Sequence, residues 1–290
     1  MKSTFISSIL FLFPYLLLAQ TTEKSLFWEI SGNGLKDTSY LYGTMHAKDK
    51  RVFDFKEGVL NSFDKCDIYA MELNPDSVNQ MAIMNLMWMK GDVSIKELLS
   101  KKEYNFLDQY FKDSIGQPIF LFNRMLPIMT SQLILSQDLK EDMELALDMH
   151  FAALAKDQNK QVVGLEKMEE QIAALDGIPY KFQAKMLYES VLDKSKGVKD
   201  NTMEDMMSAY VEGDLEQLLL ITNEENMEDE KMQELFNQLM LLNRNKVMVE
   251  RAVPLIENSS AFIAVGAAHL GGKDGVIQLL RNRGYSVVAR

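Results

Sequence analysis

Two hydrophobic patterns alternate along this chain of 290 residues. Short apolar runs rich in β-branched and aromatic residues predict buried strands, whereas Met, Leu, Ile and Ala at intervals of three and four predict amphipathic helices. The helical pattern covers residues 77–156 and about 180–257. The strand pattern is found toward both ends, at residues 26–30, 39–43, 67–73, 161–165, 261–265 and 285–289.

Strands that alternate with helices are typical of an α/β fold. We therefore expect one domain over residues 21–290, with a central mixed or mostly parallel sheet built from the N- and C-terminal segments. A large helical insertion should span about residues 77–257 and be interrupted by the strand near 161–165. A domain of this size buries a substantial core. Cys66 is the single cysteine, so packing rather than an internal disulfide must hold the fold.

The first twenty residues are typical of a signal peptide. Lys2 gives a charged start, residues 5–18 form a short apolar core, and Ala19 is a small residue at a plausible cleavage point. We expect residues 1–20 to be removed and the mature protein to be exported, periplasmic or secreted, without stable membrane insertion. The alternative is a retained N-terminal anchor, although the apolar run is short for a transmembrane span.

Charge narrows the class of partner. The formal net charge is −11, whereas nucleic acids and anionic membrane surfaces require clustered Lys and Arg. We therefore expect no nucleic-acid partner. The sequence does not indicate an oligomeric state.

Two of the three histidines end the same short motif, Gly-x-x-His, and each motif follows a predicted strand. His46 closes residues 43–46 (Gly-Thr-Met-His), and His269 closes residues 266–269 (Gly-Ala-Ala-His). A glycine at this place lets the backbone turn tightly or lets a substrate approach it closely. The repetition suggests one polar site built from both ends of the chain.

Two acidic residues, Glu72 and Glu166, also lie at the ends of predicted strands. In open α/β sheets, sites lie outside the carboxyl ends of the strands, so these carboxylates converge with both histidines if the strands are parallel neighbours. Two imidazoles and one or two carboxylates suit Zn²⁺, Mn²⁺, Co²⁺ or Fe²⁺ and leave positions for water and a carbonyl oxygen. The alternative is structural: the histidines cap strand ends, and an acid such as Glu166 favours the start of a helix.

Four further polar residues were weighed as candidates. A carboxylate such as Asp148, on an apolar helix, needs a partner if it faces inward. Arg244, beside Asn245 in an apolar helical turn, either holds a substrate carboxylate or an acid of the site, or is a surface residue near a helix end. His150, the third histidine, is interpreted as a helix residue rather than a ligand.

The candidate residues lie in motifs that follow one another along the chain: residues 40–46 (Tyr-Leu-Tyr-Gly-Thr-Met-His), 71–73 (Met-Glu-Leu), 163–166 (Val-Gly-Leu-Glu) with Gln171, 243–245 (Asn-Arg-Asn), and 265–270 (Val-Gly-Ala-Ala-His-Leu) with Gly275, Leu279 and Leu280. In the order and spacing of these motifs, the chain resembles the TraB/GumN family, which includes the Tiki proteins. The resemblance spans nearly the whole mature chain. It implies an α/β fold related to the erythromycin-esterase and ChaN-like group. It also implies the chemistry of the Tiki proteins, which are Mn²⁺- or Co²⁺-dependent peptidases that trim an extracellular signalling protein. Other relatives are tied to blocking peptide-pheromone signalling or have no assigned activity.

Carried onto this chain, the resemblance gives His46 and His269 the motif-histidine roles and Glu72 that of the early glutamate. The other polar positions of the family match Asp148, Glu166, Arg244 and Asn245.

We accordingly predict an exported metal-dependent hydrolase, of the peptidase type, that acts on a peptide or protein substrate. A divalent metal, Mn, Co or Zn, would be held by His46, Glu72 and His269. Glu166 is the predicted general base or fourth ligand, and Arg244 orients the substrate or the ligands. Two alternatives stay open: a non-catalytic protein that sequesters a peptide or a haem-like ligand, and a metal-free esterase that uses His and Glu as its acid–base pair.

Overall fold

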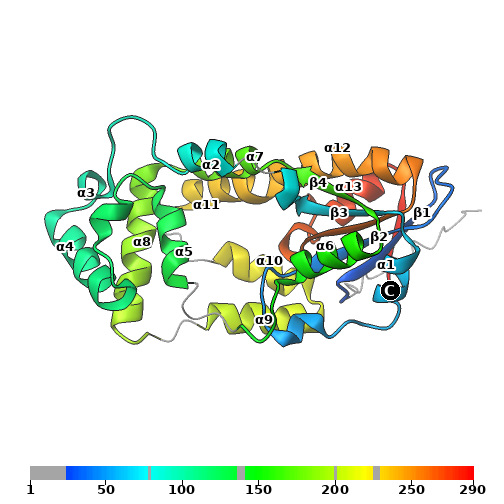
Figure 1. The fold of residues 1–290 in the computed structure, drawn as a ribbon, viewed down its shortest axis with the longest axis horizontal. Helices are drawn as coiled ribbons and strands as arrows, with labels where there is room; N and C mark the ends of the chain where they lie inside the picture. Colours follow the sequence, from blue (N-terminus) through cyan, green and yellow to red (C-terminus); the bar gives the residue numbers. More distant parts are fainter. Residues whose placement is uncertain (1–23, 78–79, 136–140, 199–200, 225–228) are drawn as a thin grey trace, which may run out of the picture.

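The computed structural model describes residues 24–77, 80–135, 141–198, 201–224 and 229–290 (Figure 1). Within these residues, six strands form one sheet. They are β1 (Phe27–Ser31), β2 (Ser39–Thr44), β3 (Ile68–Leu73), β4 (Gln161–Glu166), β5 (Ala261–Gly266) and β6 (Ser286–Ala289). All six predicted strands are thus present, each within one residue of its expected bounds.

The strand order is β4-β3-β5-β2-β1-β6. β4, β3, β5 and β2 pair in parallel, whereas β1 runs antiparallel to both of its neighbours. The prediction of a mixed, mostly parallel sheet in an α/β fold is therefore confirmed. β2 and β5 come from opposite ends of the chain but lie side by side near the middle of the sheet, and they are buried at almost every position. Strands covered by helices on both faces read as continuous apolar runs, which is how these two were found.

In the described residues, helices fill most of the chain between β3 and β5, and further helices precede β3 and follow β5. The helices are α1 (Val59–Lys65), α2 (Gln80–Leu86), α3 (Ile95–Leu98), α4 (Lys101–Tyr110), α5 (Pro127–Leu135), α6 (Leu147–Asp157), α7 (Met168–Asp176), α8 (Tyr180–Ser195), α9 (Thr202–Glu212), α10 (Leu215–Glu224), α11 (Glu230–Asn237), α12 (Asn243–Asn258) and α13 (Val276–Asn282). α6 packs on β3 and β4, and α12 contacts β3, β4 and β5. In Figure 1, α6 and α12 lie on opposite sides of the sheet.

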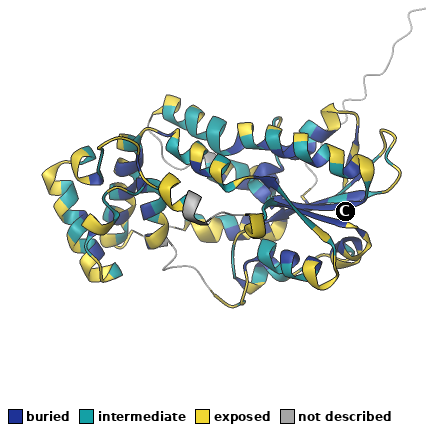
Figure 2. Ribbon diagram, turned by 45° about the horizontal axis from the view of Figure 1, so that its top comes forward, coloured by how far each residue is buried: buried dark blue, intermediate teal, exposed yellow. Residues whose placement is uncertain are grey.

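The described residues form two separate hydrophobic cores. The first surrounds the sheet, where the rings of Phe63, Tyr69, Phe151 and Phe262 contact one another. The second lies among α3, α4, α5 and α8, at the end of the molecule away from the sheet, and includes the fully buried Phe111. Figure 2 shows the buried positions gathered on the strands and on the inner faces of the helices. The helices α3, α4, α5 and α8 therefore share a core that is separate from the core around the sheet.

None of the helices in the described residues is long and apolar enough to cross a membrane. The predicted signal peptide, residues 1–20, lies outside the described residues.

Candidate active site

The two Gly-x-x-His motifs lie against each other at the carboxyl ends of β2 and β5. The parallel register pairs Gly43 with Val265 and Thr44 with Gly266. A Cβ atom added to Gly43 would lie 3.1 Å from the Cβ of Ala267, inside the second motif. Glycine at position 43 therefore allows a close contact between the motifs. The strands that precede the motifs are parallel neighbours, which was the condition set for the site residues to converge.

His269 lies in a buried 3₁₀ turn, residues Ala267–His269, with only 5% of its surface exposed. Its Nδ1 is 2.6 Å from Oδ1 of Asn245, and the amide nitrogen of Asn245 donates to the carbonyl of Asp274 at 2.9 Å. With the amide oriented in this way, the imidazole carries its proton on Nδ1 and keeps a free lone pair on Nε2. Burial lowers the pKa of His269 and outweighs the nearby Glu72, so the ring is neutral at pH 7.

Glu72, at the end of β3, is held by hydrogen bonds on both of its carboxylate oxygens. Its Oε1 accepts from the backbone N–H of Gly266 at 2.6 Å, and its Oε2 accepts from Nη2 of Arg244 at 2.8 Å. Oε1 also lies 3.9 Å from Nε2 of His269. Burial alone would raise the pKa of Glu72, but the neighbouring His269 imidazole, the charge of Arg244 and the Gly266 hydrogen bond together outweigh burial, so this pKa lies below its usual value. Glu72 is therefore an ionised carboxylate beside the second motif.

The glycine of the second motif explains how Glu72 comes so close. A Cβ atom at position 266 would stand 3.0 Å from Oε1 of Glu72, closer than most side chains tolerate. Without a side chain, the N–H of Gly266 reaches the carboxylate directly.

Arg244 joins Glu72 to a second, more deeply buried carboxylate. Its Nε and Nη2 donate to both oxygens of Glu166 at 2.7–3.2 Å. The side chain of Glu166 is 2% exposed and that of Arg244 is 13% exposed. Gln171 completes the group, since its Nε2 is 3.0 Å from Glu166 and 3.5 Å from Glu72. The charge of Arg244 is thus shared between two glutamates, which holds all three side chains in fixed positions.

His46 stands apart from this network and bonds to another acid. Its Nδ1 lies 2.9 and 3.1 Å from the two carboxylate oxygens of Asp148 in α6. The backbone carbonyl of Asp148 accepts from the buried Tyr69 hydroxyl at 2.9 Å, which fixes α6 against β3. The hydrogen bond to Asp148 raises the pKa of His46 above 6.5, against a smaller effect of burial. The partner of Asp148 is therefore the histidine of the first motif, whose side chain is 79% exposed.

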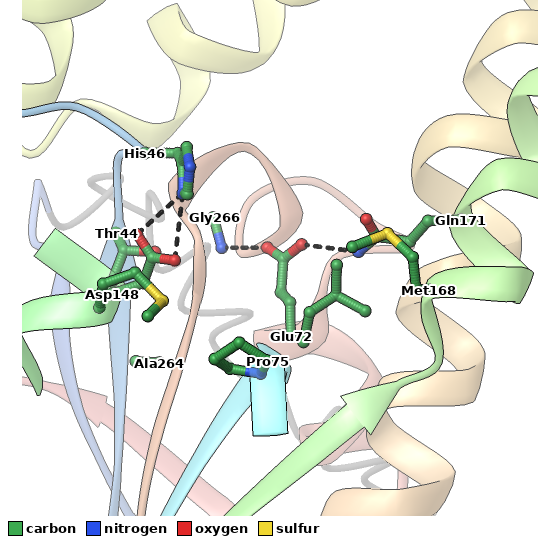
Figure 3. A pocket seen from close by; sticks show the side chains of 11 residues that line it. Thr44, His46, Glu72, Pro75, Asp148, Met168, Gln171, Ala264 and Gly266 are labelled. Atoms are coloured by element: carbon green, nitrogen blue, oxygen red, sulfur yellow. Dashed lines mark hydrogen bonds and ion pairs between the residues drawn. The ribbon is translucent and has the colours of Figure 1, made fainter. Parts of the chain in front are cut away.

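A pocket of about 500 Å³ opens over this edge of the sheet. It is lined by Thr44, His46, Glu72, Leu73, Pro75, Asp148, Met149, Met168, Gln171, Ala264 and Gly266. Figure 3 shows the His46–Asp148 pair on one side and the Gly266–Glu72–Gln171 chain of hydrogen bonds on the other. Glu166, Arg244, Asn245 and His269 stand behind this lining and support it.

The donor chemistry of these residues suits a divalent metal, although their present spacing does not enclose one. Each motif histidine has Nδ1 hydrogen-bonded to an oxygen, the arrangement that orients ligand imidazoles and leaves Nε2 for an ion. Glu72 adds an ionised carboxylate. Within the described residues, however, no three His, Cys, Asp or Glu side chains are close enough together to hold a metal ion. Binding an ion through His46, Glu72 and His269 would require these side chains to draw together.

Sequence reasoning named the polar residues of this region but missed two features. It did not pair His46 with Asp148, and it did not place Met149 and Met168 in the wall of the pocket. A signal was available, because Met149 directly follows Asp148 and Met168 lies two residues after Glu166. His150, interpreted as a helix residue, lies in α6 with its ring against that of Phe53.

Comparison with known proteins points to one family. A sequence model of the TraB/PrgY/gumN family matches residues 26–289. Metalloprotease TIKI2 of Danio rerio is 23% identical over an alignment that covers 93% of this chain and 62% of the relative. For Metalloprotease TIKI1 of Homo sapiens the values are 23%, 92% and 62%, and for the Metalloprotease TIKI homolog of Nematostella vectensis they are 22%, 86% and 64%. The chain thus spans less than two thirds of the length of these relatives. No solved structure matches it.

Proposed function

The chain belongs to the TraB/PrgY/gumN family, and on that premise we propose that it is a metal-dependent hydrolase of the peptidase type. The observation that carries the proposal is the meeting of both Gly-x-x-His motifs beside Glu72, at the edge of a pocket. Parallel α/β sheets place their active sites at this edge. The relatives named as metalloproteases favour a peptide or protein substrate over other hydrolase substrates.

We assign the metal to His46, Glu72 and His269, with Mn, Co or Zn as the ion. A divalent ion there would supply an acidic bound water and polarise the substrate carbonyl. The chain's own contribution is to present neutral imidazole nitrogen atoms. Asn245 does so for His269, and Asp148 does so for His46 when that ring has lost its extra proton.

Glu72 and Glu166 take different roles in this proposal. Glu72 lines the pocket and is ionised, so it is the carboxylate positioned to act on a substrate or to accept a proton. Glu166 was expected to be the general base or a fourth ligand. Because its side chain is almost fully buried and does not line the pocket, we assign it a positioning role instead. Arg244 likewise orients Glu72 rather than the substrate.

The test compares the three histidines of the chain. Purified wild-type protein and the His46→Ala, His269→Ala and His150→Ala variants are assayed for metal content and for cleavage of a peptide library with added Mn²⁺ or Co²⁺. We expect stoichiometric metal and turnover in the wild type and in His150→Ala, whose ring packs on Phe53 outside the pocket lining. Both should be lost in the two motif variants.

Three results would overturn the proposal. Turnover that resists chelation would favour a metal-free His and Glu esterase. Peptide capture that depends on His46 with no turnover under any metal would favour a sequestering protein. Equal trace metal in all four proteins would remove the metal site.

We also propose that the mature protein acts outside the cytoplasm, on the pattern of residues 1–20 alone. Mass spectrometry of the protein recovered from its native host tests this proposal. A mature N-terminus near residue 20 in an extracytoplasmic fraction supports it, and an intact N-terminus in the cytosol contradicts it.

A further inference from the structure

The pocket has an apolar wall that the metal proposal does not use. Five lining residues have an apolar side chain: Leu73, Pro75, Met149, Met168 and Ala264. They come from separate parts of the fold, namely the end of β3 and the turn after it, α6, the start of α7, and β5. Figure 3 places Pro75 and Met168 on the same side as Glu72, where they border the open space beside the polar edge.

Both carboxylates that line the pocket already have a bonded partner. None of the described residues that line the pocket is Lys or Arg. The two lining carboxylates, Glu72 and Asp148, are bonded to Arg244 and His46. A charged substrate side chain would therefore lose its water without gaining an unpaired partner, which is unfavourable. An apolar side chain loses nothing by the same transfer and gains contact with the wall.

The two methionines of this wall favour large apolar groups in general rather than one particular group. The unbranched thioether chain of methionine adapts to different shapes, so Met149 and Met168 accept several large apolar groups rather than one. A pocket of about 500 Å³ has room for such a group beside the polar edge.

We propose that this wall is the subsite for a large apolar side chain of the peptide, next to the bond that is cleaved, with Met149 and Met168 as its selecting residues. The inference rests on the proposed peptidase function and names the class of side chain that the same site prefers. Peptides with Leu, Met or Phe at this position should be cleaved about 10- to 100-fold faster, in kcat/KM, than peptides with Ala, Asp or Lys there.

The experiment varies one position of a peptide cleaved by the wild type and measures kcat/KM for Leu, Phe, Ala, Asp and Lys. Met168→Lys is compared with Met203→Lys, which places the same charge on the exposed face of α9. In Met168→Lys, kcat/KM should fall about 10-fold or more for the Leu and Phe peptides and should rise for the Asp peptide. Met149→Trp, which narrows the pocket, should lose more kcat/KM on the Phe peptide than on the Ala peptide, and circular dichroism checks that the variant is folded.

Binding of the same peptides, labelled with a fluorophore, to the metal-free protein gives a readout without turnover. An apolar preference in binding that Met168→Lys reverses, with no cleavage of any peptide, supports the subsite and overturns the peptidase proposal. Cleavage with less than about threefold difference among the five peptides overturns the subsite and leaves the peptidase. An identical order of preference among the five peptides in Met168→Lys and Met203→Lys also overturns the subsite proposal.

Discussion

Replacing Arg244 by Met tests whether the buried ion pair organises the site. The substitution keeps a long side chain but leaves Glu72 and Glu166 without the cation that both now contact at 2.7–2.8 Å. Breaking a buried ion pair by removing one partner costs about 3–5 kcal/mol, because an uncompensated charge stays buried. That loss is a large part of the roughly 5–15 kcal/mol by which domains are stable. We expect Arg244→Met to lose about 3–5 kcal/mol at pH 7.

A second change separates charge from packing. Glu166→Gln in the wild type removes one hydrogen-bonded charge and should cost about 1.5–3 kcal/mol. In the Arg244→Met background, the same change removes the stranded carboxylate and should restore stability instead. Gln171 can still donate to the amide oxygen at position 166. The double variant also gives a readout if Arg244→Met alone does not fold.

The pH dependence of the free energy of unfolding checks whether the charge of Glu72 stabilises the wild type and destabilises Arg244→Met. In the wild type the pKa of Glu72 is lowered, so its stabilisation is present above about pH 4.3, the unfolded value, and is lost as the pH falls through the folded pKa. In Arg244→Met the buried Glu72 loses its cation and its pKa rises, so the penalty is greatest at neutral pH and shrinks on acidification. The difference in the free energy of unfolding between the wild type and Arg244→Met should therefore become smaller as the pH falls from 7 to 4.

Urea unfolding of the four proteins, followed by circular dichroism at pH 7 and pH 4, measures these differences. A loss below about 1 kcal/mol in Arg244→Met would refute the reasoning, since a buried, shared cation cannot be removed so cheaply. Equal costs of Glu166→Gln in both backgrounds would refute it as well, because residues in one network must couple.

Three further outcomes are expected. Gly266→Ala places a Cβ atom 3.0 Å from Oε1 of Glu72 and should reduce kcat/KM about 10- to 100-fold in a peptide assay, with an unchanged rate arguing against a fixed Glu72. In metal-free protein followed by NMR, His46 should titrate above 6.5 and His269 below it, and Asp148→Asn should lower the pKa of His46 alone. The His46–Asp148 pair thus stabilises the fold at low pH and loses that effect as the pH rises through the folded pKa. Mn²⁺ at a hundredfold excess over Kd should stabilise the wild type by about 2.7 kcal/mol in thermal unfolding, and His46→Ala should not respond.

The sheet could be predicted from the sequence because its strands are short apolar runs with clear ends. β5, Ala261–Gly266, is buried at five of its six positions, and a continuous apolar run is what such a strand requires. The place of Glu72 and Glu166 near one edge followed from the parallel arrangement of β3 and β4.

The contacts that decide the chemistry could not be predicted in the same way. The hydrogen bond between His46 and Asp148 joins residues on different elements, and local periodicity carries no information about such a pair. The pairing of Glu166 with Arg244 depends on how α12 crosses the sheet, which is set by side-chain packing over the whole face. This buried pairing is why we propose a positioning role for Glu166 rather than that of a general base or fourth ligand.

The adjacency of β2 and β5 has a consequence for the order of synthesis. Thr44 leaves the ribosome well before its strand partner Gly266, which lies 266 − 44 = 222 residues further along the chain. Until then the nascent chain has neither the second histidine nor the backbone N–H that holds Glu72, so it carries no assembled site. Pairing across so long a stretch of chain is slow to form. A newly made molecule should therefore become competent only after residues 266–269 are available, and a product that stops short of residue 260 should be inactive.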